Sequence, residues 1–356
     1  MDNAATIDIC SHTRHVQRLF ILGAGFSRSI SNDFPLTCDL LKDLFNEDPI
    51  LHKKWANLSS LFTPFLRTQA TGTPEITSVL TFLEAYRAIV AKRGKADAEI
   101  REVRSRVLHA AATLLYRISN NARTSSVLRD FIGRINPKKD AILTMNWDVV
   151  IEYGLTDANV DFQYDILPAV SGLDAPKDLL VLKPQGSVHW LRHRPTPSIS
   201  EPVLHVEPPP PNPDWILSQR LGAPPAFASL ALTEPDPAII PPGFSSEDRA
   251  EGEINWSGYL LKVATYAALR AKSIVVIGYA LPPGDFHILT ALSLGLPQDL
   301  WGDGVTVYVI DPLPETFQKW KNAFNGIATF TPKPITVCHW EGELFDALKR
   351  PGGPWS

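Results

Sequence analysis

Short runs of apolar residues alternate along the chain with stretches of helical periodicity. Five of these runs end abruptly in small or polar residues. A run that is apolar throughout is typical of a strand buried on both faces, as in a parallel sheet. The pattern therefore predicts an α/β fold, in which one parallel sheet carries helices on both faces. The predicted strands are residues 19–22, 141–144, 179–182, 273–277 and 305–310.

Residues 46–136 have helical rather than strand periodicity. Apolar residues recur at helical spacing after Pro74, a residue type favoured at the first position of a helix. A second helix is predicted over 97–118, with a turn at 92–95 between the two. A further short helix is expected after Thr37, which suits an N-cap. These elements predict a helical module inserted into the sheet.

The predicted sheet domain comprises residues 17–45 and 137–331, on either side of the helical module at 46–136. Proline accounts for 31 of the 356 residues, well above its usual share of about 5%. Many of them lie in 194–244, which is predicted to be a surface excursion with polyproline stiffness, or else a partner-docking loop. Residues 332–356 form a C-terminal segment with one short helix, which packs on the sheet or joins an interface.

Composition argues against several classes of protein. The 356 residues carry a net charge of −4, whereas dedicated nucleic-acid binders usually have a basic excess. Cys10, Cys38 and Cys338 are too far apart for a zinc ribbon, and a disulfide scaffold is not expected. The sequence has no apolar stretch long enough for a membrane span and no signal-peptide pattern at its beginning. We expect a cytoplasmic protein that binds neither nucleic acid nor membrane.

Polar and glycine motifs follow the predicted strands. The carboxyl ends of parallel strands meet at one edge of a sheet, where α/β proteins bind ligands, so we expect one site there. Two glycines after the first strand allow a close approach of the backbone to a phosphate. Arg28 replaces the third glycine of the GxGxxG fingerprint, so an ordinary strand-to-helix turn is the alternative. The motif residues are Gly23, Ala24, Gly25, Phe26, Ser27, Thr144, Asn146, Asp148, Gln185, Gly186, Ser187, Gly278, Tyr279, Asp285 and Asp311.

In this order, the motifs resemble those of the sirtuin-like NAD-binding family, specifically its bacterial branch in anti-phage defence. That branch includes the NAD-depleting effectors of Thoeris and short Argonaute systems and those paired with ATPases. The resemblance covers about residues 17–315 and implies a Rossmann-like sheet with a helical module. Deacylating sirtuins carry a four-cysteine zinc ribbon, which this chain cannot build from three cysteines. The resemblance therefore argues against a protein deacylase, and no metal is predicted.

The resemblance also implies which residues bind NAD. The turn 23–27 would contact the pyrophosphate, and Asn146 and Asp148 would lie near the nicotinamide ribose. Residues 278–279 would lie near the phosphates or the adenosine. Asp311 would approach the adenosine, at a position where the family often has asparagine. The NAD-binding set implied in this way is Gly23, Ala24, Gly25, Phe26, Ser27, Thr144, Gln185, Gly186, Ser187, Gly278, Tyr279, Asp285 and Asp311.

These residue types suit cleavage of the bond between nicotinamide and ribose. Nicotinamide leaves a cationic precursor as a neutral molecule, so the sugar that remains has oxocarbenium character. Asn146 would hold the ribose hydroxyls or a water in line. Asp148 would fix that amide or stabilise the developing positive charge. The alternative for Asn146 is an Asx-type turn, in which the side chain bonds its own backbone.

One position departs from the family. Gln185 stands where the family usually has a histidine that acts as general base, and a glutamine amide cannot accept a proton near neutral pH. His189 is the predicted replacement, provided that the chain turns back after Gln185. In an extended strand the two side chains would be about 13 Å apart, and His189 would then be a polar residue beside Trp190. His189 and His193 share a metal-like spacing, but no third ligand is evident.

These observations predict an NAD hydrolase that releases nicotinamide and ADP-ribose, with Asn146, Asp148 and His189 as its catalytic residues. By resemblance, it would act as a defence effector by NAD depletion and be activated by assembly or by a partner. Homo-oligomers and a separate ATPase or Argonaute-type subunit are the expected partners. Because of Gln185, the alternative is a catalytically weak or inactive subunit that binds NAD or ADP-ribose within a larger defence complex.

Overall fold

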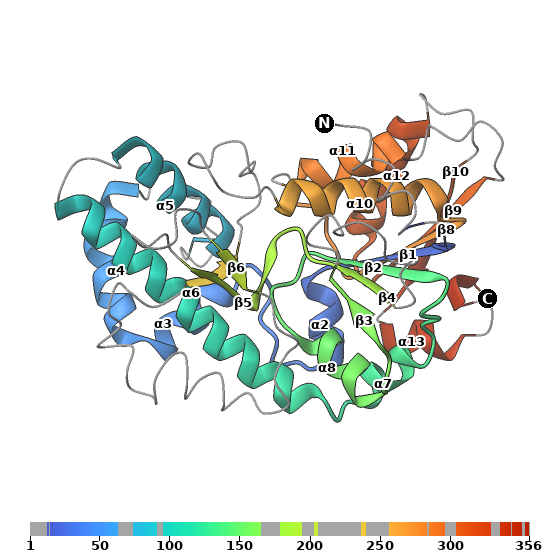
Figure 1. The fold of residues 1–356 in the computed structure, drawn as a ribbon, viewed down its shortest axis with the longest axis horizontal. Helices are drawn as coiled ribbons and strands as arrows, with labels where there is room; N and C mark the ends of the chain where they lie inside the picture. The colour runs from blue at the N-terminus through green and yellow to red at the C-terminus, as the bar shows by residue number, and fades with distance from the viewer. Residues whose placement is uncertain are drawn as a thin grey trace.

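The computed structural model in Figure 1 confirms the predicted α/β architecture, a Rossmann-like parallel sheet between layers of helices. It describes residues 13, 15–62, 74–90, 95–164, 179–193, 203–205, 236–239, 256–282, 285–295, 304–328, 335–342, 344–350 and 353–355. The predicted turn at 92–95 lies almost wholly outside the described residues. The same holds for the proline-rich segment 194–244, apart from two short strands.

Among the described residues, the sheet has seven strands, all parallel, and contains each of the predicted strands. In spatial order they are β10 (Ile335–Glu341), β9 (Val305–Asp311), β8 (Ser273–Ile277), β1 (Arg18–Leu22), β2 (Asp140–Thr144), β4 (Leu179–Leu182) and β3 (Phe162–Gln163). The central strand β1 is paired along its whole length with β2 on one side and β8 on the other. Its carboxyl end therefore lies in the middle of the ligand-binding edge.

Alternate residues of the strands enter two separate cores, one on each face of the sheet. Phe20 and Leu22 of β1 belong to one core, whereas Leu19 and Ile21 belong to the other. Figure 1 shows two helical layers, one on each side. The first layer consists of α2 (Ala24–Ile30), α7 (Ser126–Ile132), α8 (Val150–Asp157) and α13 (Leu344–Lys349), and the second of α10 (Trp256–Arg270), α11 (Phe286–Gly295) and α12 (Pro314–Ala328).

The predicted helical module is present beside the sheet. It consists of α3 (Leu40–Glu47), α4 (Pro49–Phe62), α5 (Ile76–Val90) and the long helix α6 (Lys95–Ala122), on which the other three pack. Its apolar side chains continue the core of the α2 face. The predicted boundary at 136 is too late, because α7 covers the sheet: the Phe131 ring lies 5.5 Å from that of Phe20 and 4.9 Å from that of Phe26.

The sheet extends beyond the predicted domain end at residue 331. Strand β10 pairs with β9 along its full length, so part of the predicted C-terminal segment belongs to the sheet. As an edge strand, β10 alternates polar and apolar residues and lacks the continuous apolar run of the inner strands. The helix predicted after it is present as α13, which contacts α7, α2 and β9.

A second, antiparallel sheet of three strands lies beside α6. Its central strand β5 (Gly186–His193) pairs with β6 (Val203–His205) and β7 (Asp236–Ile239). Gly186 starts β5 with a φ of +81°, in the left-handed region. Within the described part of the chain, no helix combines the length and the apolar character that crossing a membrane requires.

Candidate functional site

The turn after β1 lies directly against the turn after β8. The chain passes from β1 to β2 on one side and later returns to β8 on the other, so this edge is a topological switch point. The Gly25 amide donates to the Gly278 carbonyl at 2.9 Å. Gly278 has a φ of +56°, and a Cβ there would lie 2.3 Å from the Gly25 carbonyl carbon and the Phe26 nitrogen. Glycine is therefore required at this contact.

Gly278→Ala is expected to lower the free energy of unfolding by more than the cost of its left-handed backbone alone, which is about 1–3 kcal/mol. Gly326→Ala is a matched control, because Gly326 lies in α12 and a Cβ there meets nothing within 4 Å. That control should stabilise the protein by about 0.5–1 kcal/mol. Urea denaturation measures both changes. Equal stability of the two variants would contradict the close approach of the two turns.

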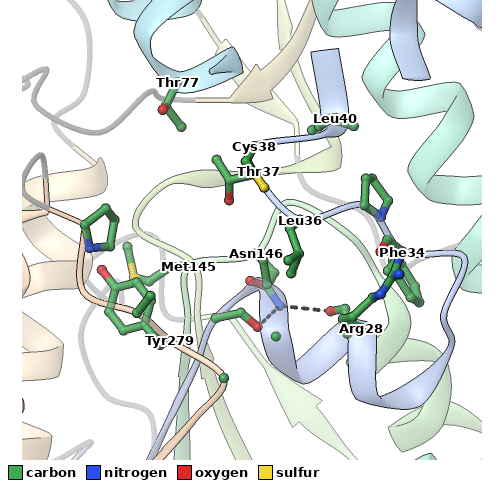
Figure 2. Close-up of a pocket in the computed structure, with 18 of the residues that line it drawn as sticks. Arg28, Phe34, Leu36, Thr37, Cys38, Leu40, Thr77, Met145, Asn146 and Tyr279 are labelled. Carbon is green, nitrogen blue, oxygen red and sulfur yellow. Dashed lines mark hydrogen bonds between the residues drawn. The ribbon is translucent and has the colours of Figure 1, made fainter. Parts of the chain in front are cut away.

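Asn146 lies just beyond β2 and reaches across to the β1 turn (Figure 2). Its side-chain nitrogen donates to the Gly23 carbonyl and to Ser27 Oγ, both at 2.9 Å. Ser27 Oγ in turn donates to Asp148 Oδ2 at 2.7 Å. The Asn146 backbone amide donates to Thr144 Oγ1 at 3.1 Å. The side chain thus bonds residues of the neighbouring strand's turn, which differs from the alternative of an Asx-type turn.

A pocket of about 900 Å³ lies beside these groups. The strand-end turns form one wall, and residues 34–40 together with α5 form another. In Figure 2, Asn146 lies between Tyr279 on one side and Arg28 on the other, with Thr77 of α5 across the pocket. The predicted residues that line it are Gly23, Ala24, Gly25, Ser27, Asn146, Asp148, Gln185, Gly278, Tyr279, Asp285 and Asp311. The sequence therefore located most of the strand-end wall.

The α5 wall was missed. Thr77, Thr81 and Ala85 recur there at helical spacing and line the pocket with Phe82. A helix face that lines a pocket has the same periodicity as one that packs in a core, so the pattern was interpreted only as a helix. The available signal was the pair of threonines four residues apart, beside the buried apolar stripe of the same helix. Phe34, Leu36, Thr37 and Cys38 were missed for a similar reason, as the start of a helix.

Four predicted binding residues do not line the pocket. Phe26 is buried against Phe131 in the core. Thr144 lies beneath Asn146 and accepts its backbone amide. Gly186 and Ser187 belong to β5, and the Ser187 hydroxyl donates to the Trp147 carbonyl at 3.2 Å. These residues thus pack or hydrogen-bond next to the pocket without lining it.

Behind the pocket, Lys183 and Glu152 form an ion pair whose side chains are 0% exposed. Lys183 Nζ donates to Glu152 Oε1 at 2.7 Å and to the Asp148 carbonyl at 2.5 Å. Burial raises the pKa of both the Glu152 and the Asp148 carboxyl, and the Lys183 charge opposes this rise. Lys183 thus ties the turn that carries Asp148 to α8.

His189 belongs to this buried group and not to the pocket wall. Its Nδ1 lies 2.8 Å from Ser187 Oγ and its Nε2 lies 3.2 Å from the Tyr164 hydroxyl. Tyr164 also donates to Glu152 Oε1 at 3.1 Å. The predicted return of His189 into the pocket does not occur, because the chain continues as β5 and turns this ring toward Ser187 and Tyr164. His189 is not among the residues that line the pocket.

Gln185, Tyr279 and Asp285 form a second hydrogen-bonded group, which does line the pocket. Gln185 Nε2 donates to Asp285 Oδ1 at 2.8 Å, and the Tyr279 hydroxyl donates to Oδ2 at 2.5 Å. Burial raises the pKa of Asp285 to about 6, although both donors favour the ionised form. The carboxyl therefore changes its charge at about pH 6.

The lining of the pocket is mainly apolar, with a small set of charged groups. Asp148, Asp285, Asp311 and Glu75 supply carboxyls, and among the described lining residues Arg28 is the one cation. Burial also raises the pKa of Asp311, whose Oδ1 accepts the Leu313 amide at 2.8 Å. Such a site suits a ligand that offers several hydroxyl donors or a positive charge. Within the described residues, no group of three or more potential ligands is placed to hold a metal ion.

No protein-family model and no curated protein matches this chain.

Proposed function

We propose that this protein binds NAD in the pocket and hydrolyses it to nicotinamide and ADP-ribose. The observation that carries the proposal is the position of Asn146. Its amide is fixed by Gly23 and Ser27 at the switch point of the sheet, on the wall of a pocket of about 900 Å³. That volume is near the upper end of the usual 300–1,000 Å³ for small-molecule sites, as a dinucleotide requires.

The charged groups of the pocket suit both the nicotinamide riboside and the pyrophosphate of NAD. The carboxyls can accept the ribose hydroxyls and favour the cationic nicotinamide ring. Ala24 and Arg28 line the pocket beside the glycine turn, at the strand end where α/β folds bind a pyrophosphate. Arg28 donates to the Phe34 carbonyl through one nitrogen, and a guanidinium has further donors for a phosphate.

Cleavage at the nicotinamide ribose needs little acid catalysis, because the leaving group departs neutral. It needs a fixed partner for the sugar or the attacking water and negative charge near the developing oxocarbenium ion. Asn146 supplies the first requirement. Asp148, linked to it through Ser27, supplies the second.

By the resemblance of its motifs, the protein would deplete NAD in anti-phage defence and be activated by self-assembly or by a partner such as an ATPase or Argonaute-type subunit.

The second candidate is a subunit that binds NAD or ADP-ribose without cleaving it. Gln185 favours this candidate, because its amide cannot take a proton and His189 does not line the pocket.

The test measures NAD binding by calorimetry and product release by chromatography, for the purified protein alone and with the proteins encoded beside it. Ala24→Asp is the informative variant, because an acid in the first turn of α2 favours the helix but repels a pyrophosphate. We expect NAD affinity to fall at least about tenfold, with no loss of thermal stability. Ala24→Ser is the neutral control. Binding without release in every assembly supports the second candidate, and absence of binding rejects both.

A further inference from the structure

We infer that Asp285 is the general base of this reaction and takes the proton of the attacking water. The inference rests on the proposed function. Asp285 lines the same pocket as Asn146, and its two oxygens are held by Gln185 and Tyr279 at 2.8 and 2.5 Å. Both donors are neutral, so the carboxyl is held in place without a cation that would neutralise it.

In this arrangement Gln185 positions the Asp285 carboxylate. It cannot replace a histidine as a base, but its Nε2 donates to Asp285 and so fixes a carboxylate at the pocket wall. A carboxylate offers about four acceptor sites, of which the two donors occupy two. Each oxygen therefore keeps a lone pair with which to accept a water proton.

The other acidic groups of the pocket are less suited to this role. Asp148 accepts Ser27 and the Val150 amide and lies beside the buried Lys183 group. Asp311 accepts the Leu313 amide at the end of β9. Glu75 precedes α5, on the wall away from the strand-end turns.

The proposed step is balanced. Water attacks C1′ of the nicotinamide ribose, and one of its protons passes to an Asp285 oxygen. The bond between C1′ and the pyridine nitrogen breaks, and its electron pair neutralises the nicotinamide. The hydroxyl remains on C1′ of ADP-ribose, and Asp285 then releases its proton to solvent. No oxidant, reductant or metal is needed.

The titration of Asp285 fits this task. Burial raises its pKa to about 6, and a base works best with a pKa near the operating pH. The other charged or titratable side chains that line the pocket with Asp285 are Arg28, Cys38, Glu75, Asp148, Tyr279 and Asp311. His287 lies two residues further along the chain, in α11. Burial lowers the pKa of His287 to about 4, so this ring is neutral above that pH.

The test compares Asp285→Asn with Asp130→Asn, which removes an exposed carboxyl on α7 outside the pocket. Under conditions in which the wild type releases nicotinamide, Asp285→Asn should lower kcat by about 10²–10⁴-fold, the usual worth of a general base. NAD binding should persist, and Asp130→Asn should behave as the wild type. The wild-type rate should rise with pH through about 6, following Asp285. Tyr279→Phe should move this rise to higher pH, because it removes a donor that favours the carboxylate.

A second readout does not depend on turnover. The folded-state pKa of Asp285 is raised, so its ionisation opposes folding as the pH increases through about 6. Asp285→Asn should therefore melt above the wild type at pH 8, and this advantage should disappear toward pH 4. Full activity of Asp285→Asn, or an unmoved pH profile in Tyr279→Phe, overturns the inference while hydrolysis stands. No nicotinamide release by the wild type in any assembly overturns the proposed function together with it.

Discussion

Replacing Lys183 with methionine is expected to lower the free energy of unfolding by about 3–5 kcal/mol, the usual cost of removing one partner from a buried ion pair. Lys183 and Glu152 are both 0% exposed, so the variant leaves a carboxylate in the core without its counter-charge. Glu152 Oε2 already has no hydrogen-bond partner among the described groups. The variant also removes the donor to the Asp148 carbonyl, so the turn beside the pocket loses a support.

The pH dependence of this loss identifies its cause. Burial raises the pKa of Glu152, and removal of Lys183 raises it further, so the orphaned carboxyl is neutralised as the pH falls. The destabilisation should be largest at pH 8 and shrink as the pH is lowered through the raised pKa. Urea denaturation at several pH values measures it. Replacing both Lys183 with methionine and Glu152 with leucine should recover much of the stability, because an apolar pair needs no charge balance. A constant loss across pH would contradict this electrostatic explanation.

The inner strands could be predicted because burial on both faces leaves a simple trace in the sequence. Leu179–Leu182 and Ser273–Ile277 are nearly continuous apolar runs, and both are inner strands of the sheet. Strand Ile335–Glu341 was missed because an edge strand meets solvent and alternates polar with apolar residues. Helix α7 was included in the predicted helical module, although it packs on the sheet, because helical periodicity shows that a face is buried but not what buries it.

The candidate site was predictable only along the strand ends. Parallel strands bring their carboxyl ends together, so Asn146, Gln185 and Gly278 could be placed at one edge from their order in the chain. The direction of His189 could not be foreseen, because β5 pairs with β7, which lies near the far end of the proline-rich segment. The hydrogen bond between Gln185 and Asp285 joins residues 100 positions apart, and no local pattern predicts it.

Asn146→Ala is expected to lower kcat for NAD hydrolysis by about 10²-fold or more, a loss typical of misplaced reacting groups. The variant removes the donor to both the Gly23 carbonyl and Ser27 Oγ, which hold this amide at the pocket wall. Loss of these bonds should also lower the free energy of unfolding by about 1–3 kcal/mol. Circular dichroism and thermal melting must therefore accompany the kinetics, so that the activity of the folded fraction is compared.

Two control variants test whether the loss of kcat in Asn146→Ala comes from this amide at the pocket wall. Ser27→Ala removes one of the two partners of the Asn146 amide and also the donor to Asp148 Oδ2, but it keeps the Asn146 side chain and its bond to Gly23. Its loss of kcat should therefore be smaller than that of Asn146→Ala. Asn322→Ala, on the exposed face of α12, removes a side chain that accepts a hydrogen bond from Gln318 and should leave the kinetics unchanged. A higher KM with unchanged kcat in Asn146→Ala would make this residue a ground-state binding group. That result would move the reacting carbon away from Asn146 and contradict its proposed role in holding the sugar or the water.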